Sequence, residues 1–200
     1  MDWRVFHSIN VWVSHHHAVA QTFHYVESYG TVLIAVAAVA LWLLARPGAD
    51  SKWKLVAASA LASGALSYLV NQVIHAIWDR ARPYEAHAGV YHPYSTSSDA
   101  GFPSDHSSAA FGLAFAVFLY NRVVGSLFLG GAVLIGVGRV IVGAHYPLDV
   151  LAGLLVGLAS AIVVVRLARP ALGYLVRLVE RITDPLLRPA WRYFSTGSSR

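Results

Sequence analysis

The chain contains no cysteine, and this absence excludes disulfide bonds, thiolate metal sites and cysteine nucleophiles. Charge is also scarce, because only 12% of the 200 residues are Asp, Glu, Lys or Arg, whereas 56% are hydrophobic. Soluble domains normally carry about 25% charged residues. The composition therefore excludes an ordinary soluble domain and indicates that much of the chain lies in a lipid bilayer.

The net charge of +5 does not indicate a nucleic-acid partner, because the basic residues border the apolar runs instead of forming one patch. The expected partners are the lipid bilayer and a membrane lipid that serves as substrate. The sequence leaves the oligomeric state open.

Five apolar stretches approach the length that crosses about 30 Å of hydrocarbon, which takes roughly 20 helical residues. They run approximately over residues 29–45, 53–78, 104–120, 123–142 and 147–167. We therefore expect an all-α integral membrane bundle of five to six transmembrane helices in one domain. Residues 1–28 mix aromatic and polar side chains and are expected to form an interfacial helix. Residues 29–169 are the expected transmembrane core, and residues 170–200 an amphipathic cytoplasmic tail.

The distribution of lysine and arginine predicts how the spans are oriented. Eleven of these 15 residues lie between spans one and two, between spans three and four, or after span five, and the other four lie on the opposite side. Basic residues are enriched in cytoplasmic loops. We therefore expect a multi-pass protein of the cell membrane, with residues 79–106 and the loop before Pro147 on the extracytoplasmic face.

Three polar segments meet at that face. They are HAIWDRARPYEAH (75–87), PSDH (103–106) and GRVIVGAHYPLD (138–149). Arg82 and Arg139 stay charged at any working pH and can bind phosphate oxygens bidentately. Ser104 stands at an N-cap position, where the free N–H groups of a helix start favour an anion. These residues together predict a phosphate site.

Two histidines and an aspartate complete the predicted site. His106 lies in the helical turn after Ser104, where it can act as a general acid. His145 lies four residues before Asp149, so the carboxylate is expected to accept a hydrogen bond from one ring nitrogen. The opposite nitrogen would then be a directed nucleophile.

These residues resemble the signature of the type-2 phosphatidic acid phosphatase superfamily, which reads Lys-x6-Arg-Pro, Pro-Ser-Gly-His and Ser-Arg-x5-His-x3-Asp. The matching residues, with the same order and spacing, are His75 with Arg82-Pro83, Pro103-Ser104-Asp105-His106, and Gly138-Arg139 with His145 and Asp149. The resemblance covers residues 75–149 and the flanking spans. His75, Asp105 and Gly138 replace the lysine, glycine and serine of the family pattern.

The resemblance implies a metal-independent lipid phosphatase that needs no cofactor. His145, polarised by Asp149, would attack the terminal phosphorus to give a phosphohistidine, and His106 would protonate the leaving group. The implied phosphate-binding residues are Arg82, Arg139, Ser104, Asp105 and His75. The Pro-Ser-Asp-His variant is similar to that of bacterial undecaprenyl pyrophosphate phosphatases, which implies undecaprenyl pyrophosphate as the substrate.

Other interpretations stay open at this point. The substrate could be phosphatidic acid, phosphatidylglycerol phosphate or another polyprenyl phosphate, and the polar residues could instead line the path of an anion transporter. Arg80 could be only an interfacial anchor and Asp149 only a helix cap. His15–His17 are interpreted as interfacial polar residues, so no metal site is expected. Gly153 and Gly157 are interpreted as helix-packing positions.

Overall fold

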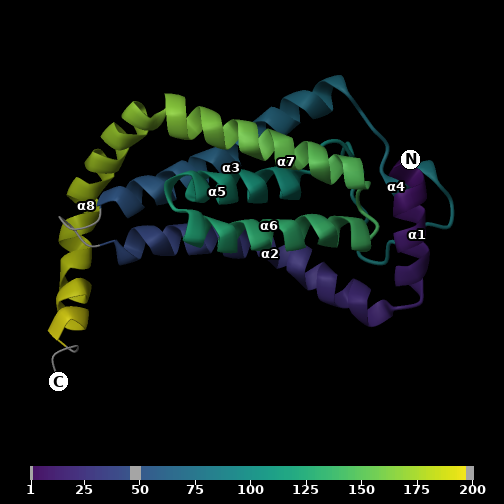
Figure 1. The fold of residues 1–200 in the computed structure, drawn as a ribbon, viewed down its shortest axis with the longest axis horizontal. Coiled ribbons are helices and arrows are strands. Elements are labelled where there is room, and N and C mark those ends of the chain that lie inside the picture. Colours follow the sequence, from purple (N-terminus) through teal and green to yellow (C-terminus); the bar gives the residue numbers. More distant parts are fainter. Residues whose placement is uncertain (1, 46–50, 197–200) are drawn as a thin grey trace.

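The computed structural model describes residues 2–45 and 51–196, and all regular structure in them is helical (Figure 1). The elements are α1 (Asp2–Ser14), α2 (His17–Leu44), α3 (Ser51–Ile77), α4 (Pro83–Ala86), α5 (Asp105–Tyr120), α6 (Arg122–Ile141), α7 (Pro147–Ile162), the short π-helical segment η1 (Val163–Leu167) and α8 (Arg169–Thr196).

Helix α5 is the centre of the bundle, because it packs against α3, α6 and α7. Its small side chains allow these neighbours to approach closely, and Ala110, Ala114 and Ala116 are fully buried. Ser104 caps its beginning, and Asn121, which follows its last residue, caps the beginning of α6. These two caps limit α5 to 16 residues.

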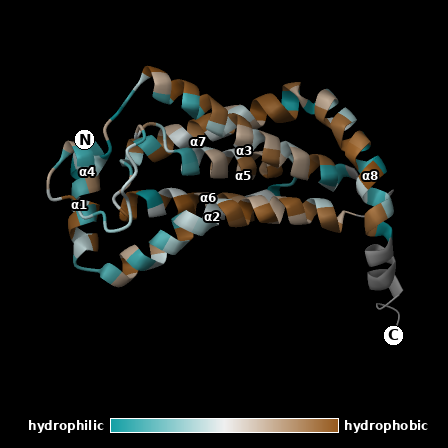
Figure 2. Cartoon of the chain, turned by 180° about the vertical axis from the view of Figure 1, so that it is seen from behind, coloured by the Kyte–Doolittle hydropathy of each residue, from teal (hydrophilic) through white to brown (hydrophobic). Residues whose placement is uncertain are grey.

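Four helical segments in the described part of the chain are long and apolar enough to cross a membrane. They are His17–Leu44, Lys52–Ile77, Arg122–Ile141 and Pro147–Leu167. The predicted all-α class is confirmed, but α5 does not reach the length expected of a fifth span, since 16 residues rise only about 24 Å. Figure 2 shows that hydrophobic residues run along the helices of the bundle. Many of them are exposed, such as Leu33 (63% exposed), Val73 (61%) and Leu155 (63%), as a lipid-facing surface requires.

The first 28 residues do not form the single interfacial helix expected from the sequence. Helix α1 ends at Ser14, where the side chains of His15 and His16 hydrogen-bond to carbonyl oxygens of its last turn. Such contacts satisfy the free carbonyl groups at a helix end. Helix α2 then begins at His17, so the polar residues up to Glu27 belong to the first candidate span.

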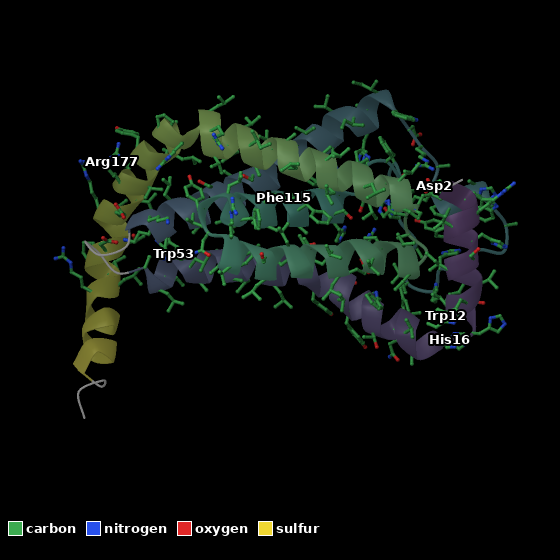
Figure 3. All side chains as sticks on the ribbon, viewed as in Figure 1. Asp2, Trp12, His16, Trp53, Phe115 and Arg177 are labelled. Carbon is green, nitrogen blue, oxygen red and sulfur yellow. The ribbon has the colours of Figure 1, made fainter. Side chains whose placement is uncertain are left out.

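Helices α1 and α8 lie across opposite ends of the bundle (Figure 1). Figure 3 places Asp2 on α1 at one end and Arg177 on α8 at the other. Lys54 near the start of α3 is fully buried and pairs with Asp184 and Glu180 of α8. A buried charge needs such partners, and removing one partner of a buried pair typically costs about 3–5 kcal/mol. This ion pair fastens α8 to the end of the bundle.

Glycines set the spacing between α5 and α7. A Cβ atom at Gly157 would lie 2.7 Å from both the Gly112 backbone nitrogen and the Phe111 Cβ, and one at Gly153 would lie 2.9 Å from the Ser107 Cβ. The interpretation of Gly153 and Gly157 as helix-packing positions is thus confirmed. This close approach keeps the start of α7 next to the start of α5.

We expect Gly157→Ala to lower the free energy of unfolding of the purified protein by about 1–3 kcal/mol, because the added methyl group overpacks the α5–α7 contact. The melting temperature should fall accordingly. Gly130→Ala is the matched control, since a Cβ there meets no atom within 4 Å. The melting temperatures of both variants in the same detergent give the comparison. Equal melting temperatures would contradict the packing role of Gly157.

Candidate functional site

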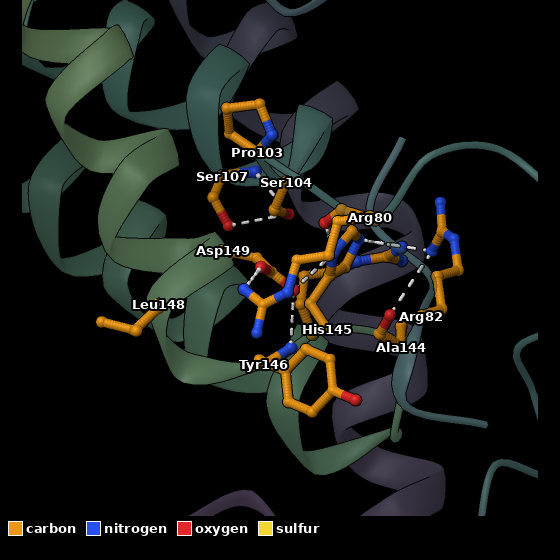
Figure 4. Close-up of polar contacts among 12 residues, drawn as sticks. Arg80, Arg82, Pro103, Ser104, Ser107, Ala144, His145, Tyr146, Leu148 and Asp149 are labelled. Atoms are coloured by element: carbon orange, nitrogen blue, oxygen red, sulfur yellow. Dashed lines mark hydrogen bonds and ion pairs between the residues drawn. The ribbon is translucent and has the colours of Figure 1, made fainter. Parts of the chain in front are cut away.

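The three polar segments of the sequence come together at the end of the bundle near α1 and α4 (Figures 1 and 4). There they enclose a cavity of about 430 Å³, which is lined by Tyr68, His75, Arg82, Tyr94, Ser95, Thr96, Ser97, Asp99, Ala100, Asp105, His106, Arg139 and His145. Six of the eight residues expected to form the site therefore line one cavity. The other two, Ser104 and Asp149, lie behind it.

His145 occupies the short loop between α6 and α7 and is only 2% exposed. Its Nδ1 lies 2.8 Å from the carbonyl oxygen of Gly101, which can only accept a hydrogen bond. Nδ1 therefore carries the ring proton, and Nε2 keeps a lone pair in the neutral ring.

Two guanidinium groups converge on that lone pair. Nη1 of Arg82 lies 3.3 Å from Nε2 of His145, and Nη2 of Arg139 lies 3.2 Å from the same atom. Burial lowers the pKa of His145 well below its ordinary value of about 6.5, and the charges of Arg139 and Arg82 lower it further. The His145 ring is therefore neutral at neutral pH. Its unprotonated Nε2 accepts from both guanidinium groups.

Different partners hold the two arginines in place. Arg82 donates to the backbone carbonyl oxygens of Asp99 (2.9 Å) and Ala144 (3.5 Å). Nη1 of Arg139 instead pairs with the buried carboxylate of Glu27 on α2. Neutral carbonyl groups thus orient one guanidinium, and a charged group orients the other.

Asp149 does not make the hydrogen bond to His145 that the sequence predicted. Its Oδ2 lies 3.7 Å from Nδ1 of His145 and instead accepts the Tyr146 backbone N–H at 2.8 Å. The other carboxylate oxygen pairs with Arg80 (Figure 4). The Gly101 carbonyl takes the ring proton because it lies closer, and the Asp149 carboxylate lies beside the ring without a hydrogen bond to it.

Arg80 is more than an interfacial anchor. It bridges the fully buried Asp149 to Asp2 of α1, whose Oδ2 lies 2.8 Å from Nη2 of Arg80. The second oxygen of Asp2 accepts the backbone N–H of Leu148 in the first turn of α7. A chain of ionic contacts therefore links α1, the loop after α3, and α7.

Helix α1 also braces the loop that covers the site. Asn10 donates from Nδ2 to the Tyr91 carbonyl (2.7 Å), and its Oδ1 accepts the Tyr91 N–H (2.9 Å). The ring of Trp3 stacks on His87 with 3.6 Å between centroids. These contacts fix the segment between α4 and α5, which supplies one wall of the cavity.

Ser104 is an N-cap whose side chain is fully buried. Its Oγ accepts the Ser107 hydroxyl at 3.1 Å and lies 3.5 Å from the Ser107 backbone nitrogen. Its backbone N–H donates to the Asp149 carbonyl oxygen at 3.1 Å, which ties the start of α5 to α7. Ser104 thereby positions the first turn of α5, and His106 of that turn faces the cavity.

Asp105 and His75 lie on the α3 side of the cavity. The Asp105 carboxylate accepts from the Asn71 amide at 2.7 Å, and Nε2 of His75 lies 3.9 Å from it. The His75 Nε2 also lies 3.1 Å from the Pro103 carbonyl oxygen, to which it donates. A second cavity of about 550 Å³ continues past these residues along α3.

Sequence reasoning missed Glu27, Asp2 and the Gly101 carbonyl. Glu27 and Asp2 fall in the first 28 residues, whose mixed aromatic and polar pattern predicts an interfacial helix away from the site. The signal for Glu27 was present, because a carboxylate inside an otherwise apolar span usually marks a functional site. The Gly101 carbonyl leaves no signal in the side-chain pattern. His15–His17 are exposed, and no group of metal-binding side chains occurs in the described residues.

Comparison with known proteins identifies the family. A family model described as the PAP2 superfamily matches residues 56–171. Undecaprenyl-diphosphatase BcrC of Bacillus subtilis strain 168 is 30% identical over 192 residues, which make up 94% of this chain and 96% of that protein.

Two solved structures share the fold. LpxE of Aquifex aeolicus has a TM-score of 0.64 at 21% identity, with 80% of this chain and 92% of that chain covered. A transmembrane PAP2-type phosphatidylglycerolphosphate phosphatase of Bacillus subtilis has a TM-score of 0.58 at 21% identity, with 90% and 84% covered. The chain therefore belongs, as its motifs predicted, to the PAP2 superfamily, and it is an integral-membrane lipid phosphatase.

Proposed function

We propose that this phosphatase removes the terminal phosphate of undecaprenyl diphosphate and leaves undecaprenyl phosphate, on the extracytoplasmic face of the membrane. The observation that carries the substrate is the 30% identity to an undecaprenyl-diphosphatase over 94% of the chain. The Pro103-Ser104-Asp105-His106 variant supports the same substrate. The sidedness rests on the arginines of α8, which lie at the end of the bundle opposite the site.

In the first half of the reaction, Nε2 of His145 attacks the terminal phosphorus. Burial and the charge of Arg139 lower the pKa of His106 to about 4 in the free site, and the negative charge of the bound diphosphate favours its protonated form. The bond between that phosphorus and the bridging oxygen then breaks, and the protonated His106 gives its proton to the departing lipid phosphate. The proton on Nδ1 stays with the Gly101 carbonyl, 2.8 Å away. The His145 ring becomes positively charged as the N–P bond forms, and the Asp149 carboxylate at 3.7 Å stabilises that charge.

In the second half, His106 takes a proton from water as the water oxygen attacks the phosphohistidine. The N–P bond breaks, inorganic phosphate leaves, and His145 returns to its neutral form. One histidine thus acts first as acid and then as base, which restores both rings at the end of the cycle.

Arg82 and Arg139 supply the positive charge that phosphoryl transfer requires. Both contact Nε2 of His145, the atom that a phosphorus must approach, so a phosphate there meets two guanidiniums from two directions. The backbone N–H groups of the turn at Asp105 add partial positive charge at the start of α5. His75 and Asp105 line the adjoining cavity, where the part of the substrate that is not transferred would lie.

Phosphate release assays test this proposal directly. In detergent with excess chelator, we expect the wild type to release phosphate from undecaprenyl diphosphate faster than from phosphatidic acid. His145→Ala should abolish release from both lipids because the nucleophile is lost. His16→Ala is the matched control, since the His16 side chain is exposed and hydrogen-bonds the Trp12 carbonyl at the end of α1, away from the site. Release from phosphatidic acid alone would overturn the proposed substrate, and release that stops with chelator would overturn the metal-independent mechanism.

The protonation state of His145 gives a second prediction, because a nucleophilic ring must be neutral. The folded-state pKa is lowered, so the ring should stay neutral with the proton on Nδ1 as the pH falls through about 6.5. Nuclear magnetic resonance of histidine-labelled protein reports both the tautomer and the charge, and loss of one signal in His145→Ala assigns it. A His145 signal that titrates at or above pH 6.5 would contradict the assignment.

Asp149→Asn tests the electrostatic role of Asp149. The amide keeps the shape but removes the charge beside His145, so kcat should fall about 100-fold or more while the protein stays folded. Asp2→Asn is the control, because it removes the other carboxylate on Arg80 but has no contact with His145, and its kcat should fall less than about tenfold. Wild-type kcat in Asp149→Asn would return Asp149 to a capping role.

A further inference from the structure

Helix α2 contributes a buried carboxylate to the site that no part of the motif pattern contains. Glu27 is 4% exposed, and it reaches Arg139 from a position 112 residues earlier in the chain. On the basis of the proposed roles of Arg139 and His145, we infer that Glu27 is a positioning residue of the phosphatase. It fixes the orientation of Arg139 and sets the net charge that the phosphate encounters.

The contacts of Glu27 leave its carboxylate little freedom to move. One oxygen accepts from Nη1 of Arg139. The other accepts the Ser28 hydroxyl at 2.9 Å and lies 3.3 Å from Nδ1 of His24. The His24 ring in turn stacks on Tyr94, with 4.3 Å between centroids, and Tyr94 lines the cavity. The carboxylate is thus held from three sides.

This fixed carboxylate determines where the rest of Arg139 points. A guanidinium is planar, so binding Nη1 to Glu27 leaves Nη2 directed at Nε2 of His145, 3.2 Å away. The Nε of Arg139 is buried and has no hydrogen-bond partner among the described residues.

Glu27 also neutralises the charge of Arg139, one of the two buried guanidinium groups beside His145. In the described part of the chain, the Arg82 side chain contacts the neutral groups of two backbone carbonyls, the His145 ring and the Tyr84 hydroxyl, whereas Arg139 pairs with the Glu27 carboxylate. Without Glu27, a bound phosphate would become the sole counter-ion of Arg139. Binding of a ground-state anion would then tighten, whereas the transition-state geometry would be lost.

Glu27→Gln tests the inference, because glutamine keeps the size of the side chain but not its charge. We expect inorganic phosphate to inhibit this variant at about tenfold lower concentration than the wild type, and we expect kcat to fall at least about tenfold. Opposite changes in phosphate affinity and turnover distinguish positioning from a loss of folding, which weakens both. Glu27→Asp restores the charge and should return phosphate affinity toward the wild-type value.

Thr31→Val is the matched control on the same helix. Its buried hydroxyl has no hydrogen-bond partner in the described residues, so kcat and phosphate affinity should both stay within about twofold of wild type. Glu27→Gln with the same unchanged values would overturn the inference, and so would a joint loss of kcat and phosphate affinity. A wild type that releases no phosphate from either undecaprenyl diphosphate or phosphatidic acid would instead overturn the proposed function itself.

Discussion

The contact of two guanidinium groups with one neutral imidazole is the interaction on which the rest of the site depends. Like charges repel, and burying each one costs free energy unless partners replace the lost water. The fold supplies these partners from distant places: backbone carbonyls for Arg82, the α2 carboxylate for Arg139, and the Gly101 carbonyl for the opposite nitrogen of His145. The site therefore requires that α2, α6 and the segment between α4 and α5 pack together.

The same requirement explains why ionic contacts lie around the site in two layers. Inside, Glu27 pairs with Arg139, and Asp149 lies beside His145. Outside, Asp2 and Arg80 hold Asp149 and join α1 to the start of α7. A site that relies on fixed charges in place of mobile water needs such supports, because rotation of a single guanidinium would remove the electrostatic complementarity that phosphoryl transfer demands.

Much of the site could be predicted because its key residues lie in three short segments with fixed spacing. The span count and the supporting residues could not, for physical reasons. The division between the stretches 104–120 and 123–142 was predicted and agrees with α5 and α6, but the caps at Ser104 and Asn121 hold α5 to 16 residues, which is short for a membrane span. Glu27 and Asp2 reach the site over 112 and 78 residues, which no local pattern records. The expected hydrogen bond between His145 and Asp149 is replaced by two bonds to backbone groups, from His145 to the Gly101 carbonyl and from the Tyr146 N–H to Asp149, and backbone groups leave no signal in the side-chain pattern.

The shortness of α5 has a consequence for the depth of the chemistry. Helices α5 and α6 meet at Asn121 and run back along each other, so α5 stops about 6 Å before α6 does, given four fewer residues. The polar start of α5 therefore lies in a recess below the rim of the bundle. A phosphate bound there lies about one helical turn inside the end of α6. The tail of its lipid can remain among the acyl chains throughout the reaction, and no step has to extract it into water.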